Sequence, residues 1–326
     1  MQPKVSVIII NWNGERDTIA CLNSLLGIDY DNCHVLLSDN GSRDESLQAL
    51  KDWRAAHLQA GRSGGVASLE ILENGRNLGF TGANTVGINH SLANGADYVL
   101  FLNNDTIVTP DFLSRMVTAA EADSLIGIVG CKIFSTNADQ QGRHKIWSLG
   151  GYVFIRGMPI NIAGGKYDKP EWTGVKEQPL INGCCMLIKR GVTETIGVQD
   201  DRLFFGMDDV EYSLRASRRG WKNLVAYDAV IYHAGSQSVT PSSGLQVYYI
   251  FRNALQLRTQ KFPWYENLVF FTYFAFRYVM AGSLYRWITR KGRVNLGVYY
   301  ALLDFFCGQT GECSHTSALR GSSTAQ

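Results

Sequence analysis

The stretch VSVIIIN at residues 5–11 decides the fold. Its apolar residues are β-branched and run without alternation, which is typical of a strand buried on both faces of a parallel sheet. Polar residues follow at once in the sequence NWNG at 11–14, and residues 15–26 then carry apolar side chains at helical spacing. The chain therefore opens with a strand, a tight polar turn and a helix.

The same alternation of strand and helix continues through residue 134. Apolar runs predict further strands, and apolar residues recurring with a period near 3.6 predict helices. The predicted strands are residues 34–39, 69–72, 98–102 and 126–134, and the predicted helices are residues 45–60, residues 84–93 and one that begins at 109–111. Such alternation with short connections predicts an α/β fold, with a mostly parallel central sheet and helices on both of its faces.

Composition restricts the class of protein. The chain has 326 residues, of which 45% are hydrophobic and 18% are charged, and its formal net charge is +2. The apolar content excludes disorder over most of the length, and the near-neutral charge argues against a nucleic-acid partner. No uncharged apolar stretch reaches about 18 residues, the length that predicts a membrane span, and we expect no signal peptide.

The seven cysteines are scattered along the sequence. None of them forms a C-x-x-C pair, so neither a zinc ribbon nor a thioredoxin-like redox site is supported. Reduced thiols in a reducing compartment are the simplest interpretation. We therefore expect a cytoplasmic protein.

Changes in composition along the chain predict its domains. Residues 135–180 lose helical periodicity and predict irregular hairpins or loops, and GRSGG at 61–65 predicts a flexible loop. We expect a catalytic domain at residues 1–255, an amphipathic helical extension at 256–310 and a flexible tail rich in Ser, Thr and Gly at 311–326.

The C-terminal extension is aromatic and basic. No Asp or Glu occurs between residues 267 and 300, whereas the same stretch holds Arg277, Arg286, Arg290, Lys291 and Arg293. Aromatic side chains interleaved with basic ones favour helices that lie on an anionic membrane surface, here the inner face of the plasma membrane. The alternative is a helical hairpin that packs on the catalytic domain or forms the seam of a homodimer.

Polar clusters follow three of the predicted strands. They are NWNG at 11–14, DNGS at 39–42 and NNDT at 103–106. Each cluster alone is explained by ordinary turn chemistry, because Asn, Asp, Gly and Ser are turn residues. Ligands of open α/β sheets bind at the carboxyl ends of the strands. Three clusters at the same edge of one sheet therefore predict a ligand crevice.

Several phosphate-binding and catalytic motifs are absent from the sequence. There is no G-x-G-x-x-G after the first strand, no G-x-x-x-x-G-K-[ST] and no G-x-S-x-G. Dinucleotide-binding dehydrogenases, P-loop enzymes and α/β-hydrolases are therefore disfavoured. If a diphosphate binds, a hard divalent cation held by carboxylate oxygen is the natural way to hold it.

An ordered series of segments resembles a known family. The segments are VSVIIINWNG (5–14), LLSDNGSRDES (36–46), NLGFTGANTVGIN (77–89), LNND (102–105), INGCCMLIKR (181–190), FFGMDDVEYSLRASRRGW (204–221) and YHAGSQS (232–238). This series resembles the family 2 glycosyltransferases of the GT-A fold. It is most similar to the subgroup of rhamnosyltransferases that build bacterial polysaccharides such as O-antigen.

The resemblance implies a set of residues that bind the nucleotide-sugar donor. Asp39 matches an acid that contacts the base and ribose, although an Asx-turn before Gly41 would equally explain it. Arg252 matches an arginine that clamps a donor phosphate, and an ion pair on a helix surface is its alternative. The other implied donor residues are Asn11, Asn13, Asn77, Gly79, Asn84, Asn104 and Asp105.

The same resemblance implies a Mg²⁺ or Mn²⁺ site. Asp105 matches the last acid of the family's D-x-D element, which here reads Asn103-Asn104-Asp105. The substitution of Asn for the first acid leaves one carboxylate, so the diphosphate must supply much of the coordination. His233 matches a histidine that completes the metal shell, and a structural histidine at a strand end is its alternative.

The catalytic base implied by the resemblance is Asp209. The acceptor-side residues are Asp208, Glu211 and Trp221. Like charges on Asp208 and Glu211 would raise the pKa of Asp209 toward the range useful for a general base. The alternative is a well-capped surface helix, because the acids precede a helix that ends in basic residues.

Together these implications describe an inverting, metal-dependent glycosyltransferase. Its donor would be a dTDP or UDP sugar, with dTDP-rhamnose as the first expectation, and its acceptor a hydroxyl of a glycan or polyprenyl-linked chain. Two rivals stay open: a nucleotidylyltransferase on a similar sheet, and an inactive carbohydrate-binding or scaffold relative. The first would require a Gly-rich basic loop after the first strand, which residues 11–14 do not provide.

Overall fold

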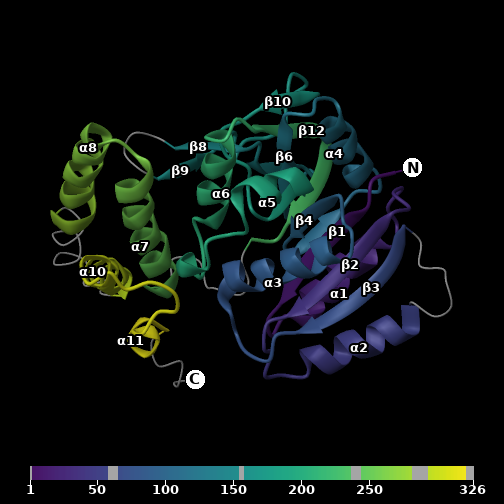
Figure 1. Ribbon diagram of the computed structural model, residues 1–326, viewed down its shortest axis with the longest axis horizontal. Coiled ribbons are helices and arrows are strands. Elements are labelled where there is room, and N and C mark those ends of the chain that lie inside the picture. The colour runs from purple at the N-terminus through teal and green to yellow at the C-terminus, as the bar shows by residue number, and fades with distance from the viewer. Residues whose placement is uncertain (1, 58–64, 154–157, 236–243, 281–292, 321–326) are drawn as a thin grey trace.

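A computed structural model describes residues 2–57, 65–153, 158–235, 244–280 and 293–320. One large sheet dominates the fold, with the strand order β10-β12-β6-β11-β4-β1-β2-β3, and β5 and β7 pair beside this path (Figure 1). β1 pairs in parallel with both β2 and β4, while β11 runs antiparallel between β4 and β6. The carboxyl ends of β1, β2 and β4 therefore share one edge of the sheet.

The elements have the following bounds. The strands are β1 (Val5–Asn11), β2 (Cys33–Asp39), β3 (Val66–Glu73), β4 (Tyr98–Leu102), β5 (Thr106–Val108), β6 (Ile126–Ala138), β7 (His144–Ser148), β8 (Gly151–Val153), β9 (Pro159–Asn161), β10 (Val175–Glu177), β11 (Cys185–Lys189) and β12 (Lys222–His233). The α-helices are α1 (Glu15–Leu25), α2 (Ser46–His57), α3 (Gly79–Ala93), α4 (Phe112–Glu121), α5 (Arg190–Ile196), α6 (Asp208–Ser217), α7 (Gly244–Lys261), α8 (Trp264–Phe274), α10 (Arg293–Phe306) and α11 (Thr316–Arg320). A 3₁₀ turn, η1 (Asp201–Leu203), and a π-helical turn, η2 (Ala275–Met280), complete the set.

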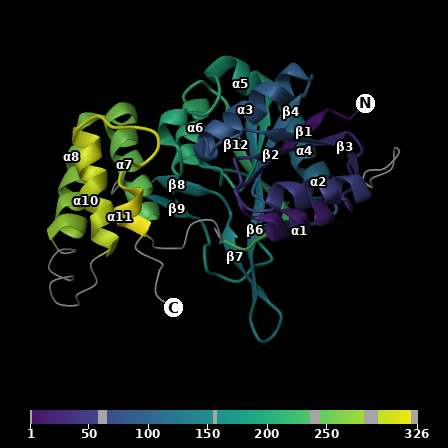
Figure 2. The same cartoon turned by 90° about the horizontal axis from the view of Figure 1, so that it is seen from below.

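Helices cover both faces of the sheet and give three layers (Figure 2). One core cluster joins the sheet to α1, α2 and α4, and a second joins the opposite face to α3, α5 and α6. Each residue of β1 is buried or nearly so, which explains its unbroken apolar sequence. The expected α/β architecture with a mostly parallel sheet is confirmed.

The elements differ from the predicted ones mainly at their ends. α3 begins at Gly79 rather than residue 84, because the carbonyl of Phe204 accepts hydrogen bonds from the backbone N–H groups of Phe80 (2.7 Å) and Thr81 (3.3 Å). Gly79 has a φ of +75°, and a Cβ there would lie 2.5 Å from that same carbonyl oxygen. A contact with a distant loop thus determines where the helix begins, and the spacing of apolar residues within the helix does not reveal this contact.

A group of C-terminal helices lies beside the sheet (Figure 1). α7, α8, α10 and α11 enclose their own apolar cluster. α10 crosses α7 so closely that a Cβ on Gly297 would lie 2.3 Å from the carbonyl oxygen of Gly244. Within the part of the chain that the structure describes, none of the helices has the length and hydropathy needed to cross a bilayer.

The predicted domain limits differ from the structure in two places. Residue 255 lies inside α7, so that helix continues across the expected boundary. The expected flexible tail is wrong for residues 311–320, which form a turn and α11 and bury Cys313 and Leu319 at 4% and 2% exposure. Residues 321–326, and 61–64 of the predicted loop, lie outside the described residues.

Candidate active site

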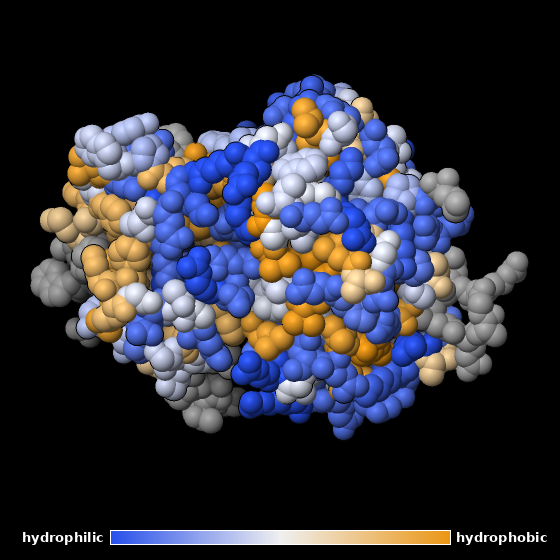
Figure 3. Space-filling model, viewed as in Figure 1, coloured by the Kyte–Doolittle hydropathy of each residue, from blue (hydrophilic) through white to orange (hydrophobic). Residues whose placement is uncertain are grey.

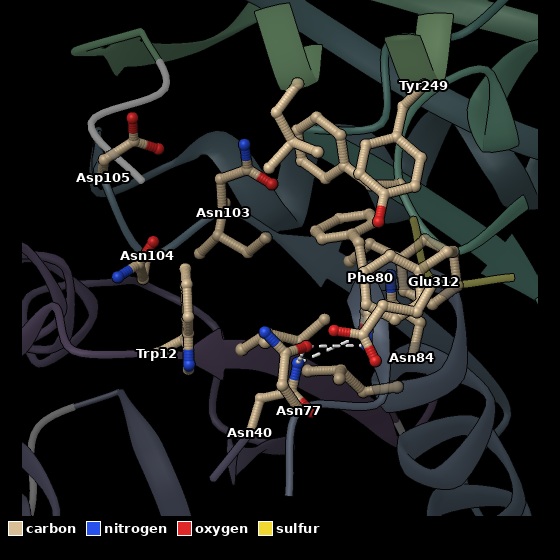
Figure 4. A pocket seen from close by; sticks show the side chains of 18 of the residues that line it. Trp12, Asn40, Asn77, Phe80, Asn84, Asn103, Asn104, Asp105, Tyr249 and Glu312 are labelled. Atoms are coloured by element: carbon tan, nitrogen blue, oxygen red, sulfur yellow. Dashed lines mark hydrogen bonds between the residues drawn. The ribbon is translucent and has the colours of Figure 1, made fainter. Parts of the chain in front are cut away.

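A cavity opens at the carboxyl ends of β1 and β4 (Figure 4). Its walls come from the start of α3, the loop before α6, α7 and the segment that leads into α11. The polar lining comprises Asn40, Asn77, Asn84, Asn103, Asn104 and Asp105. An aromatic wall is formed by Trp12, Phe80, Phe204, Phe205 and Tyr249. The crevice predicted at this sheet edge therefore exists.

Asp105 and His233 meet at one end of this cavity. The Oδ1 atom of Asp105 lies 3.1 Å from Nε2 of His233, and both side chains are almost fully buried. β5 brings them together, because Thr106 pairs with His233 in antiparallel register. Asn103 adds its Nδ2 atom at 3.4 Å from the same imidazole nitrogen. The two residues predicted to ligate a metal are thus neighbours.

The donor atoms around Asp105 fit a divalent cation. Oδ2 of Asp105 and Oδ1 of Asn103 are buried without a hydrogen-bond partner among the described residues, and Nε2 of His233 faces the same carboxylate. Buried polar atoms are almost always satisfied in folded proteins, so such a cluster of orphaned atoms points to a missing ligand. Among the described residues no group of three or more His, Cys, Asp and Glu side chains surrounds a metal position. The protein would therefore supply only part of the coordination shell.

Amide side chains line the part of the cavity that faces α3. Asn40 donates from Nδ2 to Oδ1 of Asn77 (3.1 Å), and the same oxygen accepts the backbone N–H of Gly79 (2.8 Å). Asn84 is 1% exposed, and its Nδ2 atom has no hydrogen-bond partner among the residues that the structure describes. Asn77, Gly79 and Asn84, all predicted on the donor side, line the cavity together.

Asn11, Asn13 and Asp39 form a hydrogen-bonded turn rather than a wall of the cavity. The carboxylate of Asp39 accepts bonds from Nδ2 of Asn11 (3.0 Å), the hydroxyl of Ser42 (2.6 Å) and the N–H of Ser42 (3.1 Å). Asn13 accepts the N–H of Arg43 at 2.8 Å. The turn interpretation of Asp39 thus agrees with the structure, and its bonds hold the ends of β1 and β2 together.

Asp209 is held at the start of α6. Its Oδ2 atom accepts the backbone N–H of Gly183 at 3.0 Å, and its Oδ1 atom accepts the N–H of Val210 at 2.8 Å. A Cβ on Gly183 would lie 3.1 Å from Cβ of Asp209, so glycine permits this approach. Burial raises the pKa of the Asp209 carboxyl, and these two backbone donors oppose the shift.

Asp105 and Asp209 approach one short stretch of chain. Asp209 bonds Gly183, and the carbonyl of the next residue, Cys184, accepts the N–H of Asn103 at 2.9 Å. Burial raises the pKa of the Cys184 thiol well above its usual range, and the charges of Cys185, Asp105 and Asp209 add to the shift. The side chain of Asp209 and the loop that carries Asp105 thus contact adjacent residues, Gly183 and Cys184.

Asp208 lies beside Asp209 and shares its environment. Asp208 is 6% exposed and accepts a hydrogen bond from Gln199 at 3.2 Å. Burial, together with the neighbouring charge of Asp209, raises the pKa of Asp208 to about 7. The like charge thus acts on the pKa of Asp208, whereas the pKa of Asp209 is raised by burial and not, as expected, by the charges of Asp208 and Glu211.

Glu211 and Trp221 occupy positions that differ from the predicted acceptor side. Glu211 pairs with Arg215 (2.9 Å) and Lys261 (3.5 Å), so its charge is neutralised within the chain. Trp221 donates from Nε1 to the hydroxyl of Thr195 at 2.9 Å and packs over α5. Both side chains therefore stabilise packing around α6, and neither lines the cavity.

The predicted phosphate clamp at Arg252 is corrected by the structure. Arg252 is completely buried, and its guanidinium donates to the carbonyls of Leu203 (3.0 Å) and Gly311 (2.7 Å). Asn253 donates from Nδ2 to the carbonyls of Leu203, Phe205 and Gly206 at 2.8–3.0 Å. The alternative interpretation of Arg252, an ion pair on a helix surface, is also wrong, because the side chain is buried and bonds backbone carbonyls. Arg252 fixes the loop that precedes α6.

Some lining residues escaped the sequence analysis. Asn40 lines the cavity and directly follows Asp39, and its position at the end of a predicted strand is a signal that could have identified it. Phe204 and Phe205 stand next to the acids of α6 and were visible in the same segment. Glu312 and Thr316 had no such signal, because the composition around them resembles that of a frayed end.

Comparison with known proteins gives several relatives. The chain is 27% identical over 245 residues to an O-antigen biosynthesis protein, RfbC, of Myxococcus xanthus, a match over 72% of this chain and 18% of the relative. It is 24% identical over 272 residues to a dTDP-rhamnosyl transferase, RfbF, of Shigella flexneri, over 81% and 83% of the two chains. The chain thus spans less than a fifth of the first relative and most of the second.

Solved structures share the fold. A mannosyltransferase, PcManGT, from Pyrobaculum calidifontis, in complex with GDP-Man and Mn²⁺, matches 98% of this chain and 79% of its own length, with a TM-score of 0.54 and 17% identity. The sequence profile of Glycosyl transferase family 2 matches residues 6–197, which is more than half of the chain. The chain therefore belongs to glycosyl transferase family 2.

Proposed function

We propose that this chain transfers a glycosyl group from a nucleoside-diphosphate sugar to an acceptor hydroxyl in one inverting displacement. The observation that carries the proposal is the placement of two carboxylates around Gly183 and Cys184. Asp209 bonds Gly183 from α6, and the backbone N–H of Asn103, two residues before Asp105, donates to the carbonyl of Cys184. A single displacement requires one base and one stabilised leaving group, and this pair provides a group for each.

The donor is a sugar nucleotide, and L-rhamnose carried by dTDP is the first choice. The relative from Shigella flexneri is a dTDP-rhamnosyl transferase and is matched over most of both chains. A UDP sugar is the alternative donor. The acceptor is a hydroxyl of a glycan or of a polyprenyl-linked chain, consistent with the O-antigen role of the relative from Myxococcus xanthus.

Asp105 and His233 are the residues that would hold Mg²⁺ or Mn²⁺. The structural neighbour from Pyrobaculum calidifontis contains Mn²⁺ together with GDP-Man. A bound cation supplies charge neutralisation to the leaving diphosphate. Asn104 lies beside this site, and its Nδ2 donates to the hydroxyl of Thr18 at 2.9 Å, which fixes the loop that presents Asp105.

Asp209 receives the proton of the attacking hydroxyl. Its backbone bonds to Gly183 and Val210 fix the carboxylate, and burial brings its pKa closer to the pH at which the enzyme works. Membership of family 2 leaves no support for the nucleotidylyltransferase alternative. The alternative of an inactive carbohydrate-binding or scaffold relative is disfavoured, because both Asp105 and Asp209 are present.

The C-terminal helices provide a surface for a membrane. Exposed apolar side chains line α8, η2 and α10, and this apolar patch consists of Trp264, Tyr265, Leu268, Val269, Phe276, Met280, Leu296, Tyr299, Leu303 and Phe306 (Figure 3). A lipid interface accepts such aromatic and aliphatic side chains. We propose peripheral attachment to the anionic inner face of the plasma membrane. Arg286, Arg290 and Lys291 lie outside the described residues.

Replacement of Asp209 by Asn should abolish turnover and preserve donor binding. The amide keeps the shape of the side chain but cannot accept the hydroxyl proton, so kcat should fall by about 10²–10⁴. Transfer is measured with dTDP-rhamnose and, separately, UDP sugars, and binding by calorimetry. The matched control is Asp201→Asn, an exposed acid close in sequence. Equal turnover in Asp209→Asn would remove it as the base.

The pH dependence should report the acid pair Asp208 and Asp209. The base must be ionised, and its pKa is raised, so kcat/KM should fall as the pH drops through a value above that of an ordinary Asp. Asp208→Asn removes the like charge and should move this acid limb to lower pH. A limb that stays in place or moves upward in the variant contradicts the proposed coupling.

The cation site should be detectable without turnover. Thermal unfolding of the wild-type protein with dTDP-rhamnose should shift upward on addition of Mn²⁺, because ligands that bind the native state stabilise it. Asp105→Asn should lose the part of the shift that depends on Mn²⁺. Asp31→Asn, which alters an exposed acid, should keep it. An undiminished Mn²⁺ effect in Asp105→Asn would exclude Asp105 as a ligand.

The apolar patch should bind anionic vesicles. The protein should sediment with phosphatidylglycerol vesicles, less so with neutral vesicles and less at high salt. The pair Trp264→Ser and Leu268→Ser should reduce this binding, whereas Leu125→Ser, a change at an exposed site on the sheet domain, should not. Failure to sediment, together with a patch-dependent dimer in analytical ultracentrifugation, would favour the homodimer instead.

A further inference from the structure

The segment between α10 and α11 returns to the cavity and is firmly held there. The N–H of Gly311 donates to the carbonyl of Arg202 at 2.7 Å, and its own carbonyl accepts a bond from Arg252 at 2.7 Å. Two residues later, the N–H of Cys313 donates to the hydroxyl of Tyr249 at 2.9 Å. Backbone bonds on both sides thus fix the position of Glu312.

Glu312 lines the cavity with a carboxylate that has no partner. Among the described residues, none makes a hydrogen bond or ion pair with this side chain, and it is exposed to solvent. In Figure 4, Glu312 lies on the side of the cavity opposite Asp105, as do Phe80 and Asn84. The carboxylate is therefore accessible to a ligand and positioned by the fold.

Asn84, which lines the same side of the cavity in Figure 4, also carries an unpaired group. Its Nδ2 atom is buried and meets no acceptor within the part of the chain that the structure describes, and the residue is 1% exposed. A buried amide donor without a partner is uncommon in a native protein and indicates an absent ligand atom. An amide donor near a carboxylate acceptor matches the paired donor and acceptor character of hydroxyl groups.

Charge decides which part of a nucleotide sugar lies at this end. A carboxylate repels a diphosphate, so Glu312 disfavours the phosphates there, whereas Asp105, Asn103 and His233 provide a cation site at the other end. The aromatic wall of Phe80, Phe204 and Tyr249 suits a neutral ring with polar edges. Uncharged hydroxyl groups on such a ring can donate hydrogen bonds to the carboxylate, while the C–H face of the ring packs against the aromatic side chains.

We infer that Glu312, with Asn84, binds the hydroxyl groups of the donor's glycosyl group and selects among donor sugars. The inference rests on the proposed function, because it assigns a part of the same donor. It makes the segment before α11 a component of the sugar site. Glu312 acts by accepting hydrogen bonds and takes no part in proton transfer to or from the acceptor.

The test compares binding of nucleotide sugars with binding of the free nucleotides. Calorimetry in the presence of Mn²⁺ uses three pairs of probes: dTDP-rhamnose and dTDP, UDP-GlcNAc and UDP, and GDP-mannose and GDP. Glu312→Gln should weaken the nucleotide sugar that the wild-type protein binds by about tenfold or more, since hydrogen bonds to charged groups are strong. Affinity for the matching free nucleotide should stay the same or rise.

Two variants serve as controls. Glu171→Gln changes an exposed carboxylate away from the cavity and should leave both affinities unchanged. Glu312→Asp keeps the charge on a shorter side chain and should retain more of the sugar affinity than Glu312→Gln. Because Glu312 is exposed and partnerless among the described residues, the unfolding temperature of these variants should match that of the wild-type protein.

The outcomes separate the two proposals. Equal loss of affinity for the nucleotide and the nucleotide sugar, or no loss at all in Glu312→Gln, would overturn the assignment of Glu312 to the glycosyl group. Either result leaves the proposed function intact, because the wild-type protein still binds a donor. Absence of binding by the wild-type protein to every nucleotide sugar would instead overturn the proposed function, and the present inference with it.

Discussion

The attachment of α7 to the loop at residues 203–206 is the constraint on which the site depends. Nδ2 of Asn253 donates to three backbone carbonyls of that loop. The buried guanidinium of Arg252 also donates to one of them, the carbonyl of Leu203. The loop needs such support because Phe204 and Met207 both have positive φ values, of 60° and 67°, which cost energy in residues other than glycine. Side-chain donors of Arg252 and Asn253 thus hold a loop whose backbone is strained.

That loop positions two elements of the site. The carbonyl of Phe204 starts α3, which carries Asn84, while the end of the loop starts α6, which carries Asp209. The donor wall and the base therefore share one short piece of backbone. A displacement of this piece would move both groups together, so their separation is set by the loop rather than by either helix.

Elements and residues could be predicted from the sequence where the signal lies within a few neighbouring residues. The strand at 5–11 and the acids at the start of α6 could be located because burial periodicity and helix-start chemistry leave traces within a few residues. Arg252 was misassigned because its partners, the carbonyls of Leu203 and Gly311, belong to distant segments. Glu312 was missed for the same reason: the bonds that order its surroundings come from Arg202 and Tyr249.

The lining of the cavity joins residues from opposite ends of the chain. Trp12 follows the first strand, and Thr316 begins the last described helix, yet both face the same space. During synthesis on the ribosome, the sheet can form well before this C-terminal segment leaves the exit tunnel. A nascent chain would therefore form the end of the cavity at β1 and β4 early, and the wall that contains Glu312 and Thr316 only late.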